Sequence, residues 1–76
     1  MKNNRRDIEV EARNNVGASL KALRIERNMT AEDVAAMVGL EPRTVTAIED
    51  GRYFAPLEKL VDIAEALDAK IKIVEK

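Results

Sequence analysis

The chain is short, aliphatic and nearly neutral. Its 76 residues contain no cysteine, histidine or tryptophan, and its formal net charge is −1. A chain of this length holds one small core, here an aliphatic one, with an unfolding free energy of roughly 3–5 kcal/mol. Without cysteine or histidine, disulfides, thiolate metal sites and the usual general base are excluded, so we expect no catalytic residue, metal or cofactor. No apolar run approaches the roughly 18 residues of a membrane span and no signal peptide is visible, so we expect a cytoplasmic protein.

Residues 1–14 form a polar, basic N-terminal arm that permits two interpretations. Ile8, Ala12 and Val16 recur at the i, i+4 spacing of a helix, whereas residues 8–11 also alternate as in a strand. We favour the helical spacing, which makes the arm an extension of the next helix. That helix is predicted over residues 15–27, with an inward face formed by Val16, Leu20 and Leu23.

The central stretch predicts two short helices joined by a tight turn. Thr30 can cap the first helix, because its hydroxyl can accept the backbone N–H of Asp33. Gly39 ends that helix where a left-handed residue is wanted, and Pro42 suits the first turn of the second. Two helices of this length and turn form a helix-turn-helix unit, whose second helix can enter a DNA major groove. The predicted inward residues are Val34, Met37 and Val38, followed by Val45 and Ile48.

A further helix and a strand are predicted after Gly51. Pro56 introduces the helix, whose apolar positions are Leu57, Leu60, Val61, Ala64 and Leu67. Residues 70–74 then alternate and are rich in β-branched side chains, which predicts a short strand. A lone strand needs a neighbour for its backbone groups. That neighbour is either residues 8–11 or, as we favour, the same strand of a second chain about a two-fold axis, with Ile71, Ile73 and Val74 as the dimerisation residues.

Residues 16–67 carry a dispersed pattern of matches to a known family. The matches are Gly17, Leu20, Leu23 and Arg24; Met29, Thr30, Val34 and Ala35; Gly39, Leu40, Val45, Ile48, Glu49, Gly51 and Arg52; and Leu57 and Leu60 through Leu67. In these positions the chain resembles the Xre-type helix-turn-helix family, which shares its fold with the phage lambda repressor. The resemblance implies a mainly α, four- to five-helix domain over residues 15–68, to which residues 69–76 add the short strand. It also implies sequence-specific binding to double-stranded DNA, usually as a homodimer, by a repressor or by the antitoxin of a toxin–antitoxin pair.

The second helix of the unit supplies the candidate base-reading residues. With Val45 and Ile48 buried, a rotation of about 100° per residue places Arg43, Thr46 and Ala47 on the opposite face. Arg43 could donate a bidentate pair to guanine, Thr46 could reach a base edge or a thymine methyl, and Ala47 could pack on such a methyl. The family resemblance places the usual base-reading positions at Pro42, Arg43, Thr46 and Ala47.

Phosphate contacts are expected around this helix and at the start of the one before it. Ala31 stands where the family commonly carries Gln, so only backbone N–H groups and the positive helix end remain there. Each charged candidate could equally be an ordinary solvated side chain. The candidates are Thr30, Ala31, Thr44, Arg52, Lys21 and Arg13. A family ion pair matches Arg24 and Glu49, which implies a structural link between the first and third helices.

Charge distribution leaves a second function open. Residues 1–28 hold seven basic and four acidic side chains (+3), whereas residues 29–50 hold Arg43 against five acids (−4). The proposed reading unit is thus the most acidic part of the chain, although a DNA-binding protein usually shows a basic footprint. This acidity, with Ala31 and Pro42, favours a protein-interaction module such as an antitoxin that binds its toxin. Arg43, Thr46, Arg52 and the basic N-terminal region favour DNA, which we prefer.

Overall fold

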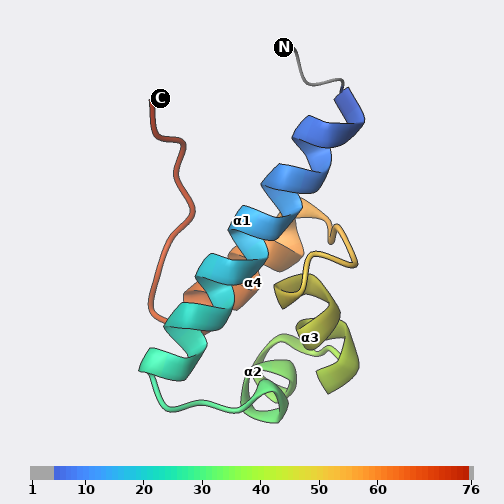
Figure 1. Cartoon of the computed structure of the whole chain (residues 1–76). Coiled ribbons are helices and arrows are strands. Elements are labelled where there is room, and N and C mark those ends of the chain that lie inside the picture. The colour runs from blue at the N-terminus through green and yellow to red at the C-terminus, as the bar shows by residue number, and fades with distance from the viewer. Residues whose placement is uncertain (1–4, 76) are drawn as a thin grey trace.

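The computed structural model describes residues 5–75, which form four helices and no strand. The helices are α1 (Arg5–Glu26), α2 (Ala31–Val38), α3 (Pro42–Glu49) and α4 (Leu57–Ala66). In Figure 1, α1 is the longest element, α2 and α3 lie on one side of it, and the C-terminal segment runs along the other. The mainly helical class is the one that the sequence predicts. Within residues 5–75, no helix is long and apolar enough to cross a membrane.

Helix α1 includes residues 5–14, the described part of the N-terminal arm. It begins at Arg5, so the spacing of Ile8, Ala12 and Val16 is helical and not strand-like. Residues 5–12 are all exposed, and Arg5 donates to Glu9 one turn later at 3.0 Å. Such an exposed i, i+4 pair adds a few tenths of a kcal/mol, roughly 0.3–0.5, to the helix. Residues 1–4 of the arm lie outside the described residues.

The core is aliphatic, as the composition predicts. Tyr53 and Phe54 are both exposed and contribute nothing to it. Helix α3 packs against α1 and α2, and α2 also packs against α4. The buried apolar residues are Leu20, Val34, Ala35, Val45, Ile48, Ala55, Leu60, Ile63, Ala64 and Leu67, with Val16, Leu23 and Val38 partly buried against them.

Two predicted inward faces are rotated from their expected positions. Met37 is 61% exposed, and Ala35 is buried instead. Leu57 and Val61 are also exposed, and Ile63 is buried in their place. An eight- or ten-residue helix contacts its neighbours over only two or three turns. The spacing of its apolar residues therefore allows more than one face, and the angle at which it meets its neighbours selects between them.

Two glycines allow the helices to meet and turn. Gly17 lies where α1 crosses the end of α3, and a Cβ at this position would collide with the carbonyl oxygen of Ile48 and approach that of Glu49 to 2.6 Å. Only a residue without a side chain permits this close approach. Gly39 has φ +72° and closes α2 in the left-handed conformation, as predicted.

The predicted C-terminal strand is wrong for the single chain. Residues 69–75 have no regular secondary structure, and Ile73 is fully exposed while Ile71 is 40% exposed. A strand needs a neighbour to satisfy its backbone groups. The predicted intramolecular partner, residues 8–11, uses its own backbone groups inside α1. The segment instead lines an open hollow together with α1 and Ala64 of α4.

Candidate nucleic-acid interface

A capping box fixes the start of α2. The hydroxyl of Thr30 accepts from the backbone N–H of Asp33 at 3.0 Å, and the Asp33 carboxylate accepts from the backbone N–H of Thr30 at 2.9 Å. The predicted Thr30 cap is thus confirmed. The Thr30 backbone N–H, followed by its side chain, holds the pKa of Asp33 below the ordinary value of 3.8. The carboxylate therefore stays charged at the helix end where a phosphate would otherwise be attracted.

At the start of α3, the Glu41 side chain contacts an arginine side chain and does not cap the helix. The N–H of Leu40 bonds to the carbonyl of Ala35 at 3.0 Å, and Pro42 then opens α3 at its first turn. Glu41 is the N-cap residue of α3, but its side chain makes no capping hydrogen bond. Instead it accepts from Arg43 Nε at 2.9 Å.

The outer surface of α3 carries the predicted reading residues. Val45 and Ile48 are buried, as predicted, whereas Pro42 and Arg43 are exposed. An open surface hollow adjoins the helix on this outer side. Its lining consists of Leu40, Arg43, Thr44, Thr46, Ala47, Arg52 and Tyr53. The fold thus brings most of the predicted base-reading residues together with two phosphate candidates.

The polar groups around this hollow are partly engaged within the chain. Thr46 Oγ1 donates to the Arg43 carbonyl at 3.0 Å, which leaves its hydroxyl oxygen as an acceptor. Arg52 Nη2 donates to Asp50 Oδ2 at 3.1 Å, just past the end of α3. Arg43 and Arg52 therefore each donate a hydrogen bond to a carboxylate two residues earlier in the chain. The sequence interpretation missed Glu41 and Asp50, although each precedes an arginine by two residues.

The other phosphate candidates lie away from the hollow. Thr30 and Ala31 begin α2, and Lys21 is exposed on α1. Arg13 differs from a solvated charge, because its Nε is buried and has no hydrogen-bond partner within the described residues. That atom is therefore not available to a DNA phosphate, although Arg13 as a whole is only half-buried.

The Arg24–Glu49 pair lies behind the reading helix. Arg24 donates through Nε and Nη2 to the two Glu49 oxygens at 2.7 and 3.1 Å, and through Nη1 to the carbonyl of Met29 at 2.9 Å. The two side chains are 14% and 4% exposed. The hydrogen bond with Glu49 raises the pKa of Arg24 above its ordinary value. One guanidinium thus connects α1, the end of α3 and the segment that leads into α2.

A capped helix, a glycine turn and a second helix with an exposed polar surface define a helix-turn-helix protein. The helix-turn-helix family model matches residues 20–73. The chain is 36% identical over 53 residues to an uncharacterised HTH-type transcriptional regulator of Archaeoglobus fulgidus, covering 70% of this chain and 75% of that protein. It is 38% identical over 53 residues to a second such regulator, from Methanocaldococcus jannaschii, covering 70% and 80%. The chain belongs to the Xre-type, lambda-repressor-like helix-turn-helix family of DNA-binding regulators, and it is not an enzyme.

Proposed function

We propose that this chain regulates transcription by reading a specific duplex DNA sequence through the major groove with α3. The supporting observation is the hollow beside α3, which joins Arg43 and Thr46 to Arg52 over a helix fixed by buried Val45 and Ile48. A helix presented in this way fits the width of a major groove.

Each reading residue has a defined chemical role in this proposal. Arg43 donates two hydrogen bonds to guanine O6 and N7. Thr46 accepts from an adenine or cytosine amino group, because its own proton is already donated to a backbone carbonyl. Ala47 and Pro42 offer only apolar contact, which suits a thymine methyl. Their four side chains would read a short element that contains at least one guanine.

Phosphate contacts fix the protein on the duplex. Arg52 and Thr44 flank the reading helix and line the same hollow. Thr30 and Ala31 lie at the positive end of α2, where backbone N–H groups can meet a phosphate. The nearby carboxylates of Glu32 and Asp33 oppose this contact. We therefore expect modest affinity per protomer and a steep dependence on salt.

A homodimer supplies the missing affinity in this proposal. Ile71, Ile73 and Val74 lie in a segment without regular structure, and they are the residues we propose to pair with the same segment of a second chain. Pairing about a two-fold axis would place two copies of α3 in successive major grooves, about 34 Å apart. Such a dimer would act as a repressor or as an antitoxin that represses its own gene.

Arg43→Ala tests this docking. The substitution should weaken binding to the selected site by roughly 1–3 kcal/mol and relax base preference at one position. Arg52→Ala is the comparison, and it should weaken all sequences similarly while reducing the salt slope by about one. Binding is measured by fluorescence anisotropy on the DNA upstream of its own gene and on a duplex selected from a random library. Unchanged affinity and preference in Arg43→Ala would show that α3 docks differently.

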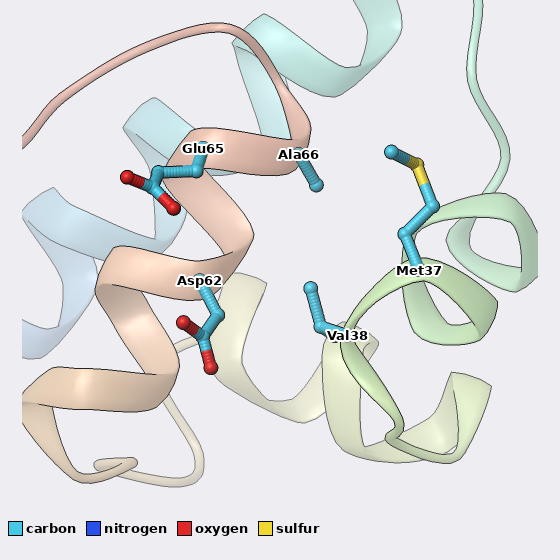
Figure 2. A pocket seen from close by; sticks show the side chains of 5 residues that line it. All are labelled: Met37, Val38, Asp62, Glu65 and Ala66. Atoms are coloured by element: carbon cyan, nitrogen blue, oxygen red, sulfur yellow. The ribbon is translucent and has the colours of Figure 1, made fainter.

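A protein-interaction module is the second candidate. Figure 2 shows the hollow between α2 and α4, where Met37, Val38 and Ala66 offer apolar surface beside the carboxylates of Asp62 and Glu65. This chemistry suits a basic and apolar segment of another protein. A stable complex with the product of the neighbouring gene, together with no affinity for any duplex, would favour this candidate over DNA reading.

A further inference from the structure

Glu41 lies at the start of α3, two residues before Arg43, and contacts its side chain. It is the N-cap residue of α3, yet its carboxylate caps no backbone N–H. Its Oε1 accepts from Arg43 Nε at 2.9 Å instead. The short side chains preferred at an N-cap, such as Asp, ordinarily accept from the second or third backbone N–H of the helix, and Glu41 does not do so. In this chain the side chain is therefore committed to the arginine.

Because Glu41 binds Arg43 at Nε, the edge of the guanidinium formed by Nη1 and Nη2 remains available for other hydrogen bonds. Among residues 5–75, the Arg43 guanidinium makes its hydrogen bond through Nε and none through Nη1 or Nη2. These two groups form the terminal edge of the guanidinium, which can donate two parallel hydrogen bonds. Guanine O6 and N7 accept such a pair in the major groove. Engagement at Nε therefore leaves this recognition available.

Without Glu41, the exposed Arg43 side chain would have no hydrogen bond within residues 5–75 that restricts its conformation. Its side chain is 86% exposed, and its contact with Glu41 is its one hydrogen bond among the described residues. A long exposed side chain loses conformational entropy when it binds, and a partner that already restricts it reduces this loss. The same carboxylate repels phosphates, so it disfavours binding to every sequence.

We propose that Glu41 is a positioning residue for base recognition, which holds Arg43 at Nε so that its terminal edge meets guanine. This inference rests on the proposed function, because it requires Arg43 to read a base. Glu41 then lowers affinity for all DNA but raises the preference for guanine at the position that Arg43 contacts. Because exposed ion pairs are weak, we expect the effect on preference to be roughly 2- to 5-fold.

Asp50 and Arg52 provide a matched control at the other end of α3. They have the same spacing and the same charges, but Asp50 holds Nη2, which belongs to the terminal edge of the guanidinium. Arg52 is thus less suited to bidentate donation and fits a phosphate. Asp50→Asn changes the charge by the same amount as Glu41→Ala. We expect it to strengthen binding to all sequences without changing base preference.

The test compares Glu41→Ala, Glu41→Gln, Asp50→Asn and Arg43→Ala. Each is titrated at several salt concentrations against a duplex selected by the parent chain and against the same duplex with each guanine replaced in turn. Circular dichroism checks that every variant is folded. Glu41→Ala should bind the substituted duplexes more tightly and lose roughly 2- to 5-fold of its guanine preference. Glu41→Gln should retain more of that preference than Glu41→Ala, because an amide oxygen can still accept from Nε.

The outcomes separate the inference from the proposed function. If Glu41→Ala strengthens all duplexes equally while Arg43→Ala loses guanine preference, Glu41 acts only by charge and the inference is overturned, but the docking of α3 stands. A loss of preference in Asp50→Asn equal to that in Glu41→Ala would also overturn it. If Arg43→Ala keeps full preference, or if the parent chain selects no duplex, both the docking and the inference fail.

Discussion

Arg24 and Glu49 form a largely buried ion pair in which neither side chain can be removed without leaving the other charge uncompensated. The guanidinium bonds both oxygens of a carboxylate that is 4% exposed, and it also bonds the carbonyl of Met29. Removing one member of a buried pair leaves an uncompensated charge, which typically costs about 3–5 kcal/mol. That is comparable to the whole unfolding free energy of a domain this size, roughly 3–5 kcal/mol. Loss of either partner should therefore release the end of α3 from α1.

A double-mutant cycle on this pair tests that role. Arg24→Ala and Glu49→Ala should each destabilise the domain by about 3–5 kcal/mol, and the double variant should lose clearly less than their sum. Urea unfolding is measured in the presence of an osmolyte, which strengthens folding enough to give each variant a transition. A coupling energy within about 0.5 kcal/mol of zero would show that the two residues act independently.

The positions of the candidate reading residues were predictable only in part. Val45 and Ile48 are the two large aliphatic residues of α3, so their burial was predictable, and it places Arg43 on the outer surface. The contact of Glu41 with Arg43 was not predicted, since an exposed glutamate two residues before an arginine is equally compatible with a solvated charge. The competition between backbone N–H groups and a nearby guanidinium is decided by the local rotamers, which residue spacing does not specify.

At the scale of the elements, local chemistry determined where α2 begins. The capping box between Thr30 and Asp33 is formed by residues three apart, so it needs no tertiary information. By contrast, which side of α2 and of α4 is buried could be determined only from the tertiary contacts of these helices. Met37 and Leu57 fit the apolar spacing but are exposed, because the contacts between short helices select one face among several.

The capping box also makes a pH-dependent contribution to stability. The pKa of Asp33 is lowered in the folded chain, so its contribution is fully present above 3.8 and is lost as the pH falls through the lower folded value. Asp33→Ala should therefore be less stable than the parent chain at neutral pH, and the difference should disappear well below pH 3.8. Urea unfolding at both pH values measures this.

Thr30→Ser is the matched control for that experiment. Serine retains a hydroxyl that accepts from the Asp33 N–H, so the variant should keep the parent's dependence on pH. If the difference between the parent chain and Asp33→Ala is the same at both pH values, the carboxylate contributes through packing and not through its charged hydrogen bonds.

For the whole molecule, the structure of the C-terminal segment could not be predicted from the sequence alone. Residues 70–74 alternate as a strand does, yet they have no regular structure in the single chain. A helix satisfies its own backbone groups, whereas a strand depends on a neighbour. The alternation of residues 70–74 therefore predicts that the segment needs a second strand, but it does not identify the chain or segment that supplies this strand. The hollow between α1 and this segment leaves space beside Ile71 and Val74.

Removing the segment tests whether that partner is a second copy of the chain. We expect deletion of residues 70–76 to give a monomer by light scattering and to abolish specific DNA binding, because two reading helices would no longer be held about 34 Å apart. The helical circular dichroism should be largely unchanged, since the buried core ends at Leu67.

Ile73→Asp sharpens this test. Ile73 is fully exposed in the single chain, so a charge there should leave the stability of the monomer unchanged. In a strand pair, Ile73 would lie on the apolar face, where an unpaired carboxylate is costly. Lys72→Ala is the control, because it changes the opposite face and should leave the dimer intact. A truncated chain that remains dimeric would locate the interface elsewhere, and the exposed Tyr53 and Phe54 next to α4 would then be the surface to test.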